Sequence, residues 1–377
     1  MQPESAMSRT SCRGAVVYLF AFDIAHELTD LAATRLLGQP LAPFLLDTGK
    51  RSPKEAFFYR PLMARLPPAK RVGPHGPVRV ETLIKVLPIG AISISIRVPF
   101  AVERIEELVA YHDLELDGRS LAAEARNLAR EVQQELLAYC DRPVTELAEE
   151  EAYTVFCVEA PLQPSEGRSM NAEEWLRQHG RTVAGLLMQE GDASQLSNQE
   201  VRESISRHLS YHEQDLVVID WDAALVLEEP GHFEEIVYVL ELANVQLAEL
   251  EAYDRLLDAT LDRSYRDMRR LSWRKRSAVL RELRELRIDL TRLSDELLNI
   301  AKFFGDWHLA RIYQSVSGRF HLTEWHRFVD DKLRSIDSCY QLLQHDQTNR
   351  WMLILEAAIV ALFILDVALI LLGPGSK

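Results

Sequence analysis

The C-terminal stretch Trp351–Leu372 constrains the fold of this chain more than any other feature. It is 22 residues long, and its only charged side chains are Glu356 and Asp366. At about 1.5 Å per residue, a helix of this length spans the ~30 Å hydrocarbon core of a bilayer. Residues 350–373 are therefore predicted to form a transmembrane helix, with residues 374–377 as a tail. The alternative is an amphipathic helix buried in a soluble core.

The two acidic residues affect both the insertion free energy of this segment and its contacts within the membrane. Neither lies at its centre, where an acid costs about 2.5–3.5 kcal/mol, so insertion remains favourable. Their ten-residue spacing places them about 80° apart around a helix, so both can face one partner. Ala357 and Ala361 form a small-xxx-small pair that allows two helices to approach closely. We hypothesise that the acids are neutral or hydrogen-bonded at a helix–helix contact; the alternative is that they are tolerated near the membrane interface.

The charge of the chain is unevenly distributed. The net charge is −14, and residues 101–262 carry 36 acidic against 11 basic side chains, while both flanking parts carry a basic excess. The middle of the chain would therefore repel nucleic acid and anionic lipid. The four cysteines form no CxxC pair, which favours free thiols in a reducing compartment. Residues 1–12 lack the apolar core of a secretory signal and are predicted to be disordered.

Residues 13–229 are predicted to form a sandwich-like α/β domain, so the fold class is α+β. Apolar and β-branched runs indicate strands at 16–22, 78–87, 91–98, 153–159, 216–219 and 223–227. The alternation in 91–98 predicts that one face of that strand is exposed to solvent. Helices are expected at 23–37, 102–112 and 119–140. Another is expected to begin after Asn171, which with Glu174 has the spacing of a capping box.

Residues 230–349 are predicted to form a coiled-coil region, beginning after Pro230-Gly231. Leucine and other apolar residues recur at heptad spacing from Phe233 to about Arg270, with Asp254 as one polar position in the seam. A second run extends from Leu283 to Ile300, and a third from Phe320 to Leu343. The first two helices should form an antiparallel hairpin, and the third should continue into the membrane segment. One hairpin leaves part of the apolar seam exposed, so homo-oligomerisation is expected.

A basic and aromatic segment lies where the tip of this hairpin is predicted. Aromatic–basic mixing suits RNA or a ribosome, and it suits anionic lipid equally well. The third interpretation is a solvated helix face. This anionic-partner patch consists of Arg263, Tyr265, Arg266, Arg269, Arg270, Trp273, Arg274, Lys275 and Arg276.

No motif for catalysis, a cofactor, a metal or a phosphate loop is evident, so the chain is predicted not to be an enzyme. Asp47-Thr48-Gly49 matches the aspartic-protease tripeptide in one copy, and we interpret it as a turn. His208 and His212 are four residues apart beside Glu213 and Asp215. On a helix they could form a metal face, but a surface helix is the favoured interpretation.

The segments LVVIDWDAALVLEEP, from Leu216, and RWMLILEAAIVALFILD, from Arg350, are similar to the required-for-meiotic-nuclear-division (Rmd/Sif) family, a family of unknown domain function. Glu356 and Asp366 occupy the two acidic positions of its closing pattern. The resemblance implies an α/β domain, long helices, a C-terminal membrane anchor and no established enzymatic activity. It implies a bacterial member in the inner membrane, or alternatively a mitochondrial inner-membrane protein. Because no secretory signal is evident, the body is expected on the cytoplasmic side.

The expected function is a non-enzymatic membrane scaffold or tether that self-associates through its coiled-coil and membrane helices. A first alternative is a membrane tether for a ribosome or RNA, acting through the basic hairpin tip. A second is a ligand-binding or enzymatic α/β domain recruited to the membrane.

Overall fold

The computed structural model describes residues 12–29, 33–44, 61–73, 76–160, 171–268, 288 and 307–372. The chain divides into two compact units, Met1–Ala252 with Asp295–Trp325, and Tyr253–Ser294 with His326–Lys377. Each unit is described by itself below. The predicted disordered segment 1–12 lies outside the described residues except for Cys12, the first residue of a strand.

A ten-stranded sheet forms the centre of the first unit, with strand order β14-β15-β16-β13-β1-β9-β8-β6-β5, while β7 pairs with β8. Strands β13 and β16 are parallel, and the other neighbours are antiparallel. The strands are β1 (Cys12–Asp23), β5 (Ala42–Pro43), β6 (Leu62–Arg65), β7 (Ala69–Gly73), β8 (Gly76–Val86), β9 (Ala91–Val102), β13 (Glu151–Glu159), β14 (His208–Leu209), β15 (Leu216–Ile219) and β16 (Ala223–Glu228). The strand predictions at 16–22, 78–87, 91–98, 153–159, 216–219 and 223–227 are confirmed.

Short strand pairs flank this sheet. They are β2 (Ala25–Leu28) with β12 (Cys140–Pro143), β3 (Arg35–Leu36) with β4 (Gln39–Pro40), and β10 (Glu115–Leu116) with β11 (Arg119–Ser120). The helix predicted over residues 23–37 is therefore wrong. Its apolar residues have helical spacing, but Leu28 pairs with Cys140 of β12 and Leu36 lies in β3. Tertiary pairing has overridden a short local pattern.

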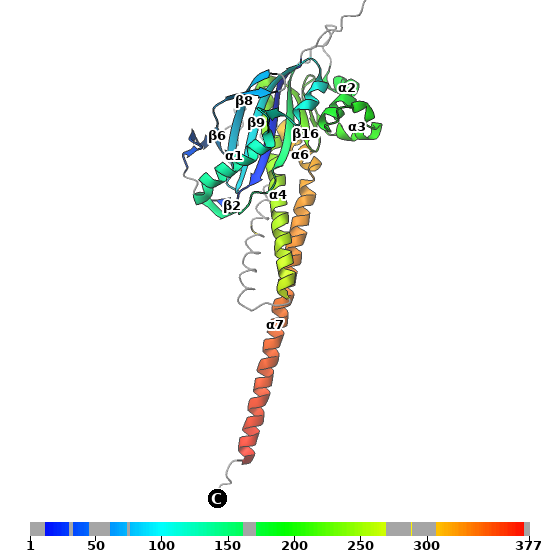
Figure 1. Cartoon of the computed structure of the whole chain (residues 1–377). Helices are drawn as coiled ribbons and strands as arrows, with labels where there is room; N and C mark the ends of the chain where they lie inside the picture. Colours follow the sequence, from blue (N-terminus) through cyan, green and yellow to red (C-terminus); the bar gives the residue numbers. More distant parts are fainter. Residues whose placement is uncertain are drawn as a thin grey trace, which may run out of the picture. The chain divides into compact units, whose positions relative to one another are not determined.

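Helices cover one face of the sheet with their apolar stripes. In α1 (Leu121–Leu136), the buried residues Leu121, Ala125, Ala129, Val132 and Leu136 follow the helical repeat. Figure 1 shows α1 lying across this face of the sheet. Its buried residues share a core with Tyr18 and Phe20 of β1. Asn171 is confirmed as the N-cap of α2 (Ala172–Leu187), because its side chain accepts a hydrogen bond from the Glu173 N–H at 2.9 Å. The remaining short helices are η1 (Ile105–Tyr111), η2 (Leu137–Tyr139), η3 (Ala193–Gln195) and α3 (Asn198–Ser204).

The opposite face of the sheet is also buried, which corrects the prediction for β9. Ser93 and Ser95 are only 1% and 7% exposed. The Ser93 hydroxyl donates a hydrogen bond to Glu241 Oε1 at 2.7 Å. Glu241 belongs to α4 (Phe233–Met268), which follows η4 (Pro230–His232). Ser93 therefore contacts a buried carboxylate rather than water. The sheet of this unit is therefore covered by helices on both faces.

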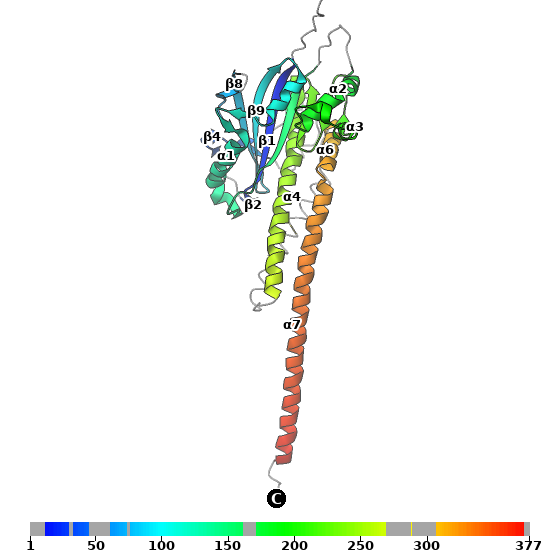
Figure 2. The ribbon, with the colours of Figure 1, turned by 45° about the vertical axis from the view of Figure 1, so that its right-hand side comes forward.

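Two further helices complete the described chain: α6 (Trp307–Arg319) and α7 (Leu322–Leu372). In the second unit, the last turns of α4 and the first half of α7 run side by side in the same direction (Figure 2). Lys332 Nζ lies 2.6 Å from Asp254 Oδ1 and 2.7 Å from Asp258 Oδ1. Burial acts to lower the pKa of Lys332, but its hydrogen bonds to both carboxylates outweigh it and raise that pKa above the ordinary value. The polar position at Asp254 thus has a partner on α7.

The coiled-coil hairpin stays a prediction. Its first helix is described as far as Met268, and its second heptad run, from Leu283 to Ile300, lies outside the described residues. The third run is described as the beginning of α7, where Val329 and Ile336 are buried as a seam requires. This part of α7 contacts α4 through the ion pair of Lys332 with Asp254.

Candidate functional site

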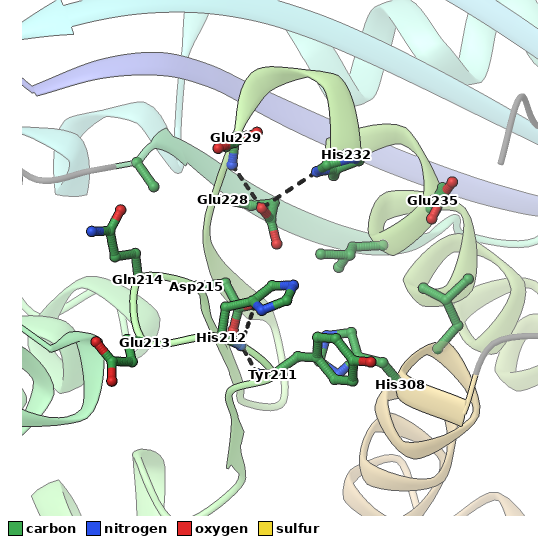
Figure 3. A pocket seen from close by; sticks show the side chains of 13 residues that line it. Tyr211, His212, Glu213, Gln214, Asp215, Glu228, Glu229, His232, Glu235 and His308 are labelled. Carbon is green, nitrogen blue, oxygen red and sulfur yellow. Dashed lines mark hydrogen bonds and ion pairs between the residues drawn. The ribbon is translucent and has the colours of Figure 1, made fainter. Parts of the chain in front are cut away.

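A pocket of about 400 Å³ lies in the first unit, where five segments of the chain meet (Figure 3). It is formed by the end of β13, the loop before β15, the end of β16, the region from η4 to the start of α4, and the start of α6. Most of its lining side chains are acidic or histidine. The acidic ones are Glu213, Asp215, Glu228, Glu229 and Glu235, and the histidines are His212, His232 and His308.

The loop before β15 is held in place by one carboxylate. Asp215 is 6% exposed, and its two carboxylate oxygens accept hydrogen bonds from the backbone N–H groups of Tyr211, at 2.6 Å, and His212, at 2.8 Å. An aspartate that accepts from the backbone in this way closes a local turn. The turn places the rings of Tyr211 and His212 against each other, with centroids 4.6 Å apart. Asp215 therefore positions the aromatic side of the pocket.

The opposite side depends on Glu228, the last residue of β16. Its Oε1 accepts a hydrogen bond from the Glu229 N–H at 2.8 Å and lies 3.6 Å from His232 Nδ1. Its backbone oxygen accepts from Ala160 N at 2.9 Å, which ties β16 to the end of β13. The Glu228 side chain is only 13% exposed. The Glu228 carboxylate is thus anchored at the C-terminal end of β16, where it lines the pocket.

The start of α6 contributes the third side. His308 lies against Tyr211, with ring centroids 5.3 Å apart, so an aromatic contact joins α6 to the loop before β15. Among the described residues, no group of three or more His, Cys, Asp or Glu is arranged to hold a metal ion. The pocket therefore combines several carboxylates, imidazoles and a phenol ring without the convergence that a metal centre requires.

Only part of this pocket was foreseen from the sequence. His212, Glu213 and Asp215 do lie together, as their proximity in the chain indicated. His208 is in β14, so the predicted surface helix bearing His208 and His212 is wrong. The remaining lining residues come from segments far apart in the sequence, and no local signal connected them.

The residues singled out at the C-terminus lie in one helix. Glu356, Asp366, Ala357 and Ala361 all belong to α7. Among the described residues, this is the one helix long and apolar enough to cross a membrane: Met352–Leu369 has a mean hydropathy of 2.5, and none of it is buried in the structure. The predicted membrane association is supported to that extent.

The anionic-partner patch is described only in part. Arg263, Tyr265 and Arg266 fall in the last turns of α4, while Arg269, Arg270, Trp273, Arg274, Lys275 and Arg276 lie outside the described residues. Asp47, Thr48 and Gly49 lie outside them as well. The RNA, ribosome and lipid contacts assigned to the patch remain predictions.

Comparison with known proteins identifies a different family from the one the sequence suggested. The family described as "Uncharacterized protein MJ0711, N-terminal domain" matches residues 13–234. The uncharacterized protein MJ0711 of Methanocaldococcus jannaschii is 24% identical over 222 residues, which are 59% of this chain and 66% of that protein. The match thus spans slightly less than two thirds of the relative. No solved structure matches the chain.

The predicted resemblance to the Rmd/Sif family is therefore wrong. The bacterial setting inferred from that resemblance is wrong as well, since the matching relative is archaeal. The misleading segments were a pair of apolar strands and a C-terminal membrane-type helix. Burial and lipid solvation select such residues in many unrelated proteins, so these patterns are weak evidence of kinship. The match that identifies the family covers the α/β part of the chain instead.

Proposed function

We propose a function for this chain from the premise that it belongs to the family of the uncharacterized protein MJ0711, N-terminal domain. The proposed function is a non-enzymatic membrane scaffold that is anchored by α7 and self-associates through its long helices. The descriptions of the family and of the archaeal relative name no activity, so the proposal rests on the chain's own residues.

One observation carries this proposal: the last third of α7 exposes a continuous apolar surface. Leu355, Leu362 and Phe363 are 62%, 64% and 70% exposed. The helix is 51 residues long, or about 75 Å at 1.5 Å per residue, which is far more than a bilayer requires. Soluble proteins rarely leave an apolar patch of this extent in water. A bilayer around Met352–Leu369 would cover it.

We expect the full-length chain to sediment with membranes and to resist extraction by alkaline carbonate. Combining Leu355→Arg, Val360→Arg and Leu362→Arg should release it into the supernatant, because the arginines at the two central positions 360 and 362 together cost about 5–7 kcal/mol of insertion free energy and Leu355→Arg adds to that cost. The matched control combines Leu355→Ala, Val360→Ala and Leu362→Ala, which keeps the segment apolar and should remain in the pellet. A wild-type chain that stays soluble after high-speed centrifugation without detergent would contradict the proposal.

Self-association is the second part of the proposal. Within the membrane, we expect the helices to contact each other at the small-residue pair Ala357 and Ala361. Combining Ala357→Leu with Ala361→Leu should weaken self-association about tenfold, because bulky residues prevent close helix approach. Sedimentation equilibrium of the detergent-solubilised chain measures this. The control combines Ile359→Leu with Phe363→Leu on the opposite side of the helix and should leave the association unchanged. A wild-type chain that sediments as a monomer would remove self-association from the proposed function.

A further inference from the structure

We propose that the side of α7 bearing Glu356 and Asp366 binds a transmembrane helix of a different membrane protein, one that carries two lysine or arginine residues about ten residues apart. This inference rests on the proposed function, because it requires Met352–Leu369 to lie in a bilayer. It goes beyond that function by naming a partner other than a second copy of the chain.

Both acids lie at the depth of the hydrocarbon core rather than at its boundary. None of the apolar window Met352–Leu369 is buried in the structure, so both side chains would face lipid or another helix. Glu356 lies about 7 Å and Asp366 about 8 Å from the middle of this window, whereas half of the hydrocarbon core is about 15 Å thick. Long lysine and arginine side chains can reach the headgroups from such a depth, but acidic side chains are shorter. Each acid therefore needs a partner within the membrane.

The acids lie on the side of α7 opposite the small residues. At about 100° per residue, the direction midway between Glu356 and Asp366 is about 160° from the direction midway between Ala357 and Ala361. Self-association through the alanines therefore leaves the acids pointing away from the second copy. The acidic side of the helix is a separate contact surface.

This acidic side has the spacing of a helix-packing seam. Met352, Glu356, Ile359, Phe363 and Asp366 recur at alternating intervals of four and three residues, which keeps their side chains on one side of a helix. The three apolar members are 55%, 58% and 70% exposed. A neighbouring helix would cover them along the same line that reaches both acids.

The charge of the partner follows from the composition of the segment. Met352–Leu369 contains no lysine, arginine or histidine, so a second copy would bring two more acids and no cation. A carboxylate and a cation attract each other strongly where the dielectric constant is low. The two acids are about 15 Å apart along the helix, so two basic residues at matching depths of a different helix can neutralise both. Ile359 and Phe363 would pack between the two ion pairs.

The test is binding of dye-labelled transmembrane peptides to the full-length chain in a neutral detergent, measured by sedimentation equilibrium. The probe is a leucine–alanine helix with two lysines about ten residues apart in its apolar core. A second peptide has leucines at those positions, and a third has the same two lysines at its ends. The probe should bind about tenfold or more tightly than either of the others, because only its charges reach the acids.

Combining Glu356→Gln with Asp366→Asn should lower the affinity for the probe to that for the leucine peptide, because the charges are lost while side-chain shape is kept. The matched control combines Ala357→Leu with Ala361→Leu on the opposite side of the helix. It should change probe binding less than about twofold while it weakens self-association.

The outcomes separate the alternatives. Preferential binding of the probe that is lost in the acid variant and kept in the alanine variant supports the inference. Equal binding of all three peptides, or probe binding that survives in the acid variant, would overturn it. Loss of self-association in the acid variant would also overturn it, because the acids would then contact a second copy. An anchored, self-associating chain that binds the three peptides equally removes this inference alone, whereas a chain that stays soluble without detergent removes the proposed function.

Discussion

Replacing Glu241 by leucine is expected to lower the free energy of unfolding by about 3–5 kcal/mol. Glu241 pairs with Lys85 of β8 and accepts the Ser93 hydroxyl hydrogen bond, and the Lys85 and Glu241 side chains are only 7% and 3% exposed. Without the carboxylate, the Lys85 ammonium group remains buried. It retains the ring of Phe44, whose centroid is 4.4 Å away, and the ring of Tyr238 at 5.4 Å. Two cation–π contacts do not replace a charged partner in a dry interior.

Urea unfolding of the detergent-solubilised full chain, followed by tryptophan fluorescence, measures this loss. Adding Lys85→Met to Glu241→Leu should recover most of it, because both charges are then removed together. The control is Glu107→Leu. Its side chain is 33% exposed and its carboxylate lies 3.5 Å from Nε of Arg104, whose side chain is 74% exposed, so the loss of this solvent-accessible pair should cost less than about 1 kcal/mol. A Glu241 variant no less stable than the Glu107 variant would contradict the prediction.

The second large effect is expected from Arg319→Leu, again about 3–5 kcal/mol of unfolding free energy. The Arg319 guanidinium donates to Asp220 Oδ1 through Nε at 3.0 Å and through Nη2, and to Glu203 Oε1 through Nη1 at 3.0 Å. Asp220 also accepts from the Ser204 hydroxyl and from Trp221 N. Both side chains of the central pair are below 10% exposed. The pair holds the end of α6 against the β15–β16 turn, so its loss leaves a buried carboxylate without its cation.

Tyr153 lies beside the same cluster of Arg319, Asp220 and Glu203. Burial raises the pKa of Tyr153 well above its ordinary value, the neighbouring Asp220 carboxylate raises it further, and Arg319 acts in the opposite direction. Its hydroxyl donates to the Asp220 backbone oxygen at 3.0 Å, and its ring packs edge-on against Phe320. These contacts join the β15–β16 turn, β13 and the α6–α7 junction.

The matched control for Arg319→Leu is Arg311→Leu, an exposed position on the same helix, which should change stability by less than about 0.5 kcal/mol. Adding Asp220→Asn to Arg319→Leu should restore part of the loss, because the neutral amide no longer buries a charge. The same urea experiment applies to all three variants. If Arg319→Leu and Arg311→Leu have equal unfolding midpoints, the cluster contributes no measurable stability.

Local sequence was a good guide where burial alone selects the residues. Strands β1, β13, β15 and β16 are continuous apolar runs because both faces of this part of the sheet are covered, and such runs are recognisable without knowing their neighbours. The turn between β8 and β9 requires a glycine for a backbone reason. Gly90 has φ +92°, and a Cβ there would lie 1.8 Å from the Ala25 carbonyl oxygen.

Local sequence misled where a polar residue has a distant partner. The alternation of serine and isoleucine in β9 has the pattern of a half-exposed strand, yet the serines lie in the interior beneath α4. The pocket illustrates the same limit, because His212, Glu228 and His308 come from three separate segments. A sequence pattern records the chemistry of a side chain, but not which other side chain it will meet.

The sequence by itself therefore determined the apolar character of Met352–Leu369, the central strands and the cap at Asn171, because solvation and hydrogen bonding between near neighbours decide these features. Only the tertiary structure decided that Lys85 pairs with Glu241, 156 residues away, and that Arg319 pairs with Asp220, 99 residues away. A buried charge must find its partner in space, and sheet pairing and helix packing create that proximity. The polar pocket depends on the same packing.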